Sequence, residues 1–332
     1  MNYKFELKGS RRFCSLDKFK IPIFFSLVDY RNNYFTSDDP KKIIEFYNGF
    51  ENRDQLIQWM KEGPKGVANI HEVNGDKDVI VVITTSDFNG KYAKECRENI
   101  FKGLHMVFVE SAEIPDPYFS DGHNFNVGIK KAMEYNPKWV VVSTEDMVKI
   151  DSADTLKHQL LALDNKKYDA VFTKPSNYHS SPERISQRNL LYDIYCRVTN
   201  KNYGRASLKM FNKFEIKYFI SPILGKYSRL FKEGYQFLEI QDFGIYSSEW
   251  ISRMNGEVHD EIFISAAEDT DISLRLSFNR NPIAIIDYKI GDSPPGFFLG
   301  NGTQRGLRTI AGLTYLNYKW KDILDREERE RR

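Results

Sequence analysis

From residue 78 onward, short apolar runs alternate with segments of helical spacing. The first run, residues 79–83, reads Val-Ile-Val-Val-Ile. Similar runs occupy residues 104–109, 139–142, 169–172 and 283–287, with helical spacing between several of them. Strands that alternate with short helices are typical of a largely parallel sheet with helices on both faces. We therefore predict an α/β fold.

Composition excludes several classes of protein. The chain has 332 residues with 48 Lys and Arg against 46 Asp and Glu, and its net charge of +2 is too small for a dedicated nucleic-acid binder. No apolar run approaches the roughly 20 residues of a membrane span, and the first residues lack the apolar core of a signal peptide. Three isolated cysteines favour a reducing compartment. We predict a cytoplasmic protein that binds no nucleic acid, with peripheral membrane contact left open.

Two acidic motifs lie far apart in the chain. The first, Ser-Thr-Glu-Asp at residues 143–146, follows an apolar run, so it would lie at the C-terminal tip of a strand, where open α/β sheets bind ligands. The second, Ala-Glu-Asp-Thr-Asp at residues 267–271, opens a predicted helix. Carboxylates in such places suit a divalent cation and a general base, which indicates metal-assisted transfer of a phosphate-bearing group. The plainer alternatives are an acidic surface turn and the capping of a helix by acids.

The regions outside the alternating pattern carry less information. Residues 1–77 contain no chemical motif and form an N-terminal extension of unclear role, for which an extra sheet edge or an oligomer contact is the simplest interpretation. Residues 174–240 are predicted to be a helical insertion on the acceptor side, and the basic and aromatic residues interleaved over 209–232 would also suit an anionic membrane surface. Residues 301–332 are predicted to be a C-terminal helix with a charged tail.

The order of the motifs from residue 79 to residue 300 resembles that of GT-A-fold glycosyltransferases, most closely the family 2 group. That order is strand–Thr-Thr, strand–Glu, Asn-x-Gly at a helix start, strand–x-Glu-Asp, and finally Glu-Asp-x-Asp-hydrophobic-x-x-Arg. The resemblance implies a GT-A, Rossmann-like domain over residues 78–300. It also implies a metal-dependent, inverting enzyme of the hexosyltransferase type. Such an enzyme moves a sugar from a UDP- or GDP-sugar to a hydroxyl of a glycan or lipid-linked acceptor.

The resemblance also implies roles for individual residues. Asp269 would be the catalytic base, and Asp146 would bind Mg²⁺ or Mn²⁺, as the metal that neutralises the diphosphate. Thr144 stands where the family usually has the first Asp of Asp-x-Asp, and Asp292 is a candidate for a further metal ligand. The donor-binding residues would be Thr84, Thr85, Glu110, Asn126, Gly128 and Glu145. Asp271 is better explained as a structural partner of Arg275, four residues later on the same helix.

Two other functions compete with this interpretation. One is a catalytically degenerate subunit that binds a sugar nucleotide or assembles with an enzyme. The other is a nucleotidyltransferase, although residues 84–90 lack the Gly-rich basic loop expected there. Dinucleotide-binding, P-loop and serine-hydrolase motifs are absent, and the histidines are not spaced as zinc ligands.

Overall fold

The computed structural model describes the following residues: 37, 39–50, 52–63, 65–111, 120–173, 180–185, 235–240, 243–264, 267–292, 311–312, 314–316, 318–320, 322–323 and 326. Within them the chain forms an α/β fold around a seven-stranded sheet with the order β1-β3-β2-β4-β9-β6-β10. The strands are β1 (Ala68–Val73), β2 (Asp76–Thr85), β3 (Leu104–Ser111), β4 (Trp139–Thr144), β6 (Ala170–Thr173), β9 (Phe243–Ser247) and β10 (Ile283–Ile286). Five of them are parallel, whereas β1 and β9 run in the opposite direction. The predicted α/β class and largely parallel sheet are therefore confirmed.

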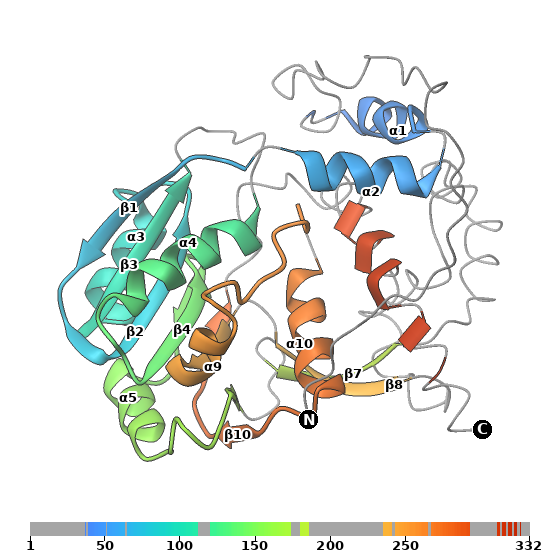
Figure 1. Cartoon of the computed structure of the whole chain (residues 1–332). Helices are drawn as coiled ribbons and strands as arrows, with labels where there is room; N and C mark the ends of the chain where they lie inside the picture. The colour runs from blue at the N-terminus through green and yellow to red at the C-terminus, as the bar shows by residue number, and fades with distance from the viewer. Residues whose placement is uncertain are drawn as a thin grey trace.

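Helices cover both faces of this sheet (Figure 1). On one face lie α3 (Lys91–Glu95), the π-helical turn η3 (Cys96–Ile100) and α5 (Ala153–Leu161). On the other face lie α4 (Asp121–Met133), α9 (Ser248–Arg253) and α10 (Glu268–Phe278). We call these the α3 face and the α4 face.

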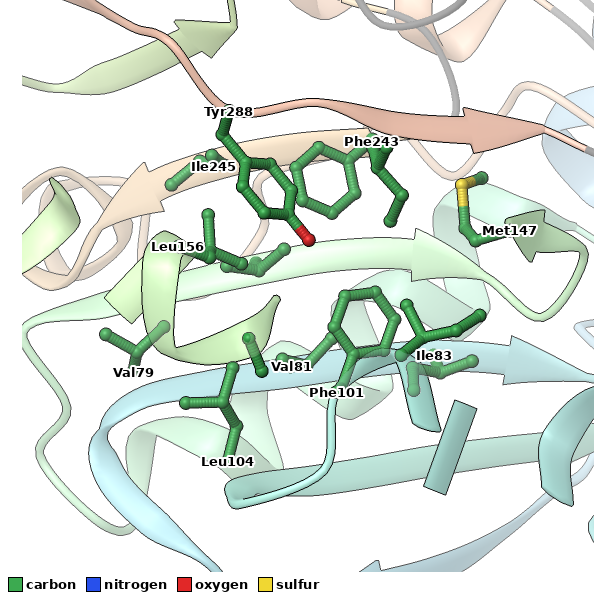
Figure 2. Packing of buried hydrophobic residues seen from close by; sticks show 14 of the residues in the cluster. Val79, Val81, Ile83, Phe101, Leu104, Met147, Leu156, Phe243, Ile245 and Tyr288 are labelled. Atoms are coloured by element: carbon green, nitrogen blue, oxygen red, sulfur yellow. The ribbon is translucent and has the colours of Figure 1, made fainter. Parts of the chain in front are cut away.

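Successive side chains of β2 pack into different halves of the core. Val79, Val81 and Ile83 belong to the cluster on the α3 face, part of which Figure 2 shows, whereas Ile80 and Val82 belong to the cluster on the α4 face. Side chains of a strand alternate between the faces of a sheet, and both faces are covered here. An uninterrupted β-branched run is the expected sequence of such a strand.

The N-terminal extension supplies part of the folded body. Its β1 is an edge strand that pairs antiparallel with β3, which is one of the roles considered for this region. The helices α1 (Pro40–Asn48) and α2 (Arg53–Glu62) lie beside the described helical residues between 311 and 326, which we call the C-terminal segment (Figure 1). The buried side chains of α1, α2, α10 and the C-terminal segment form a third apolar cluster.

The predicted helical insertion is bounded by strands. β7 (Ser180–Ile185) and β8 (Tyr235–Ile240) pair antiparallel as a two-stranded ribbon, so the prediction of helix is wrong at these two ends. Pairing between segments about 50 residues apart decides the structure of both ends, and local helical spacing does not report it. The basic stretch at 209–232, and with it the predicted membrane contact, lies outside the described residues. A second ribbon joins β5 (Met147–Lys149) to β11 (Ile290–Asp292).

The close approach of α4 to the sheet depends on Gly128. A Cβ atom at this position would overlap Val82 and would lie 2.8 Å from Cγ2 of Val109, and both valines are fully buried. We expect Gly128→Ala to lower the free energy of unfolding by about 1–3 kcal/mol. The β-branched side chains of Val82 and Val109 are stiff, so the helix must shift to accommodate the added methyl group. Urea denaturation measures this loss.

Gly122→Ala is the matched control on the same helix, because its Cβ would lie 3.3 Å from the nearest atom, Cβ of His259. Both variants gain the same helix propensity, so their difference reports the overlap with the sheet. A Gly128→Ala protein as stable as Gly122→Ala would contradict the packing argument.

Candidate functional site

The topology places a switch point at the carboxyl ends of β2 and β4. β2 lies between β3 and β4 in the sheet. The chain passes from β2 to β3 over the α3 face and returns from β3 to β4 over the α4 face. Where crossovers diverge in this way, open α/β sheets bind ligands beyond the strand ends. We call this end of the sheet the carboxyl edge.

Glu145 joins the ends of β2 and β4 at the carboxyl edge. Its Oε2 accepts a hydrogen bond from Oγ1 of Thr85 (2.5 Å), and its Oε1 accepts from the backbone N (3.1 Å) and the Oγ (2.7 Å) of Ser86. The structure therefore brings together two of the predicted donor-binding residues, Thr85 and Glu145. Through these bonds the Glu145 carboxylate braces the ends of β2 and β4 against each other.

Asp146 is held by Thr144, the last residue of β4. Thr144 donates its hydroxyl to Oδ1 of Asp146 over 2.6 Å, and the Asp146 side chain is half-buried. Thr144 lies opposite Thr84 in the sheet, and by alternation from Val82 and Val142 both point to the α4 face. The residue that departs from the Asp-x-Asp pattern thus orients the carboxylate predicted to bind the metal.

The β5–β11 ribbon brings a further acidic residue to this place. Asp292 lies opposite Met147, the residue that follows Asp146. Mg²⁺ uses one or two protein carboxylates and completes its shell with phosphate oxygens and water. The Asp146 carboxylate offers hard oxygen atoms of the kind that such an ion requires. No group of three or more His, Cys, Asp or Glu residues that could hold a metal occurs within the described ranges.

Glu110, at the end of β3, fixes the loop after β2. Its Oε1 accepts from the backbone N of Phe88 (2.8 Å), and its Oε2 lies 2.8 Å from Nε2 of His71. The Phe88 ring stacks on His71 with centroids 4.3 Å apart, and the Arg97 guanidinium lies 4.3 Å from the centre of the same ring. These contacts preorganise the loop beside Thr85, and the predicted contact of Glu110 with the donor stays a prediction.

Asn126 and Gly128 both have structural partners on α4. Asn126 is fully buried; its Nδ2 donates to the carbonyl oxygen of His259 (2.8 Å) and Oε1 of Glu261 (3.0 Å), and its Oδ1 accepts from the backbone N of His259 (2.9 Å). Gly128 allows the helix to meet β2 and β3 closely. These contacts explain both residues without a ligand, and their donor-binding role stays a prediction.

The first turn of α10, which carries Asp269, lies at the same edge. β10 begins five residues after α10 and runs parallel to β6, so α10 must run back along the sheet and begin at the carboxyl edge. Burial raises the pKa of Tyr246 on β9, and the negative charges of Asp269 and Glu268 add to this rise. The Tyr246 side chain lies over Gly244, two residues earlier on β9, because a Cβ added to Gly244 would lie 2.5 Å from the Tyr246 hydroxyl. Gly244 lies opposite Val142 in the sheet. Ile272 and Leu276 of α10 pack in the cluster on the α4 face, so this helix lies on the same face of the sheet as Thr84 and Thr144.

Two further polar residues at this edge were missed by sequence reasoning. Ser111 lies two residues beyond Val109 on β3, and Asn124 lies one turn before Gly128 on α4, so both point toward the end of the α4 face. Both side chains are buried, and within the described part of the chain Ser111 Oγ and Asn124 Nδ2 have no hydrogen-bond partner. Only the residue spacing from Val109 and Gly128 could have indicated them.

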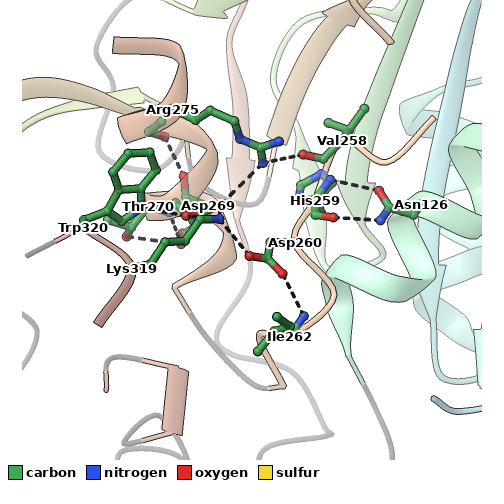
Figure 3. Close-up of polar contacts among 12 residues, drawn as sticks. Asn126, Val258, His259, Asp260, Ile262, Asp269, Thr270, Arg275, Lys319 and Trp320 are labelled. Atoms are coloured by element: carbon green, nitrogen blue, oxygen red, sulfur yellow. Dashed lines mark hydrogen bonds and ion pairs between the residues drawn. The ribbon is translucent and has the colours of Figure 1, made fainter. Parts of the chain in front are cut away.

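A buried polar network surrounds Asp271, two residues after Asp269. Figure 3 shows Arg275, Lys319 and Trp320, which belong to it. Asp271 is fully buried; its Oδ1 accepts from Nε1 of Trp320 (2.7 Å) and lies 2.8 Å from Nζ of Lys319. The predicted pairing with Arg275 is confirmed, at 3.5 Å, although the shorter bond of Arg275 goes to the carbonyl oxygen of Val258 (2.6 Å). The contributions of Lys319 and Trp320 could not be predicted, because they lie almost 50 residues further along the chain.

No protein-family model matches the chain, and no curated protein matches it. Among the described residues, no helix combines the length and the apolar character needed to cross a membrane.

His259, beside Asn126, makes stability depend on pH. Burial, with a smaller contribution from the Arg275 charge, lowers the pKa of His259 to about 3, against about 6.5 in an unfolded chain. Between these values the unfolded state binds more protons, so this residue makes the free energy of unfolding rise with pH, by at most ~1.4 kcal/mol per pH unit. We expect His259→Phe, which retains an aromatic ring, to flatten the pH dependence between about pH 6.5 and 4.5.

Denaturation of both proteins across this range measures the effect. Carboxylates that titrate in the same range are common to both, so the difference between the two curves isolates His259. Parallel curves would show that the imidazole is accessible to protons in the folded protein.

Proposed function

We propose that this protein is a metal-dependent, inverting glycosyltransferase of the GT-A type. It would move a sugar from a UDP- or GDP-sugar to a hydroxyl of a glycan or lipid-linked acceptor. The observation that carries the proposal is topological: the turn after β4, which carries Asp146, and the first turn of α10, which carries Asp269, both belong to the carboxyl edge of the sheet. These residues are more than 100 positions apart in the chain, and a metal ligand and a general base must meet at one substrate.

The proposed donor site uses the α4 side of the carboxyl edge. Asp146, oriented by Thr144, would hold Mg²⁺ or Mn²⁺, which when bound neutralises the diphosphate and makes it a better leaving group. The hydroxyls of Thr84 and Thr144 would orient the donor at the carboxyl edge. Glu145 would act as a brace, because its carboxylate is bonded to Thr85 and Ser86.

Asp269 is the proposed general base. It would accept the proton of the acceptor hydroxyl while that oxygen forms a bond to the anomeric carbon and the bond from that carbon to the phosphate oxygen breaks. A single displacement leaves no covalent sugar–protein intermediate, so the configuration at the anomeric carbon inverts.

One observation favours the alternative of a subunit that binds a sugar nucleotide without catalysis. Thr144 stands where the resembled family usually has an acidic residue. Because Glu145 is bonded to Thr85 and Ser86, Asp146 is the one acidic side chain of residues 143–146 outside the brace. A bound donor that is neither transferred nor hydrolysed would favour this alternative.

The role of Asp269 is tested by Asp269→Asn. We expect transfer to fall by ~10²–10⁴-fold, because the amide cannot take the proton, whereas donor and metal binding persist. Glu249→Gln is the matched control, because Glu249 is an exposed acid in the first turn of α9, and it should transfer sugar at the wild-type rate. Product NMR should show inverted anomeric configuration.

Retained configuration would contradict the single displacement. Near-normal turnover of a folded Asp269→Asn protein would leave Asp269 as an acid that only stabilises the start of α10.

A further inference from the structure

The first turn of α10 lacks the usual side-chain cap. Its N-cap residue, Ala267, has a left-handed backbone (φ 76°) and provides no side-chain hydrogen bond. By contrast, serines cap the helices α4, α5 and α9. Within the turn, Oδ1 of Asp269 accepts from the backbone N of Thr270 (2.6 Å), and contacts with other elements add to this bond.

Hydrogen bonds hold this turn from two sides. On the side of β8, Thr270 donates to Oε1 of Glu239 (2.5 Å), and Oγ of Ser273 accepts from the backbone N of Ile240 (2.8 Å). On the side of the C-terminal segment, Lys319 and Trp320 bind Asp271. Asp271 lies two residues after Asp269, in the same turn.

Lys319 also balances two carboxylates at this point. Its Nζ lies 2.8 Å from Asp260 and 2.8 Å from Asp271, and Tyr315 donates to the same oxygen of Asp260 (2.9 Å). Burial works to raise the pKa of Asp260, but the Lys319 charge and hydrogen bond hold that pKa below its usual value. Without Lys319, the fully buried Asp271 would retain only Trp320 and the 3.5 Å contact with Arg275 among these partners. A buried carboxylate deprived of its cation is costly, and the turn would move to relieve it.

We propose that Lys319 and Trp320 are positioning residues for Asp269. Through Asp271 they fix the first turn of α10, so that the C-terminal segment completes a site whose other residues lie on the sheet and on α10. The inference rests on the proposed function, since it assigns Asp269 the role of base. A small displacement of a reacting group reduces the rate of the chemical step far more than it reduces the affinity for a substrate bound elsewhere.

The test is Lys319→Met, which keeps most of the side-chain stem and removes the charge. We expect kcat to fall by roughly ten- to a hundredfold while the affinity for the nucleotide sugar changes by less than about twofold. Lys319→Arg, which retains the positive charge, should recover most of the lost rate. The matched control is Lys157→Met, which removes a lysine 2.6 Å from Asp76 at the opposite end of the sheet and should leave kcat unchanged.

If Lys319→Met does not fold, Trp320→Phe provides the same test. It removes only the indole N–H and keeps an aromatic ring next to Phe278, whose centroid lies 5.2 Å from that of Trp320. We expect a several-fold loss of kcat, again with donor affinity retained.

The outcomes distinguish this inference from the proposed function. Wild-type protein that transfers no sugar overturns both. Active wild type with normal kcat in the folded Lys319→Met protein, or in Trp320→Phe where that protein does not fold, overturns the positioning role alone. Equal losses of kcat and donor affinity, or an Arg variant as slow as the Met variant, also overturn it.

Discussion

The position of β2 between β3 and β4 is the constraint on which the rest of the structure depends. Parallel strands require crossovers, and the two crossovers that start and end at β3 pass over opposite faces of the sheet. This divergence makes the ends of β2 and β4 the switch point at which such sheets bind ligands. The same arrangement makes α4 and α10 begin at that edge, so strand ends and helix starts meet there.

Two adjacent carboxylates in the turn after β4 make different contacts at this edge. Glu145 is engaged with Thr85 and Ser86 and ties two strands together. Asp146 takes its hydrogen bond from Thr144, which belongs to the α4 face. The two adjacent acids therefore differ in their contacts: Glu145 braces the strand ends, and Asp146 is the one that we propose to bind a metal.

Local patterns predicted the parts of the fold that depend on neighbouring residues. The runs that became β2, β3 and β4 are recognisable because burial on both faces requires apolar residues at every position. The edge strand β1, the β7–β8 ribbon and the contacts of Lys319 with Asp260 and Asp271 depend on pairing between distant segments. The candidate acids were found because they directly follow or open a recognisable local pattern. Ser111, Asn124 and the partners of Asp271 were not found, because their roles depend on contacts between distant segments.

The central claim, that Asp146 binds a metal against a nucleotide-sugar diphosphate, is tested most directly by ligand-dependent thermal unfolding. With Mn²⁺ and a UDP- or GDP-sugar at about 100 times its Kd, the account expects ~2.7 kcal/mol of added stability. This gain should vanish in EDTA and in Asp146→Asn, and it should persist in Asp154→Asn, which removes an exposed acid from the first turn of α5. Equal stabilisation in EDTA, or in Asp146→Asn, would contradict the account.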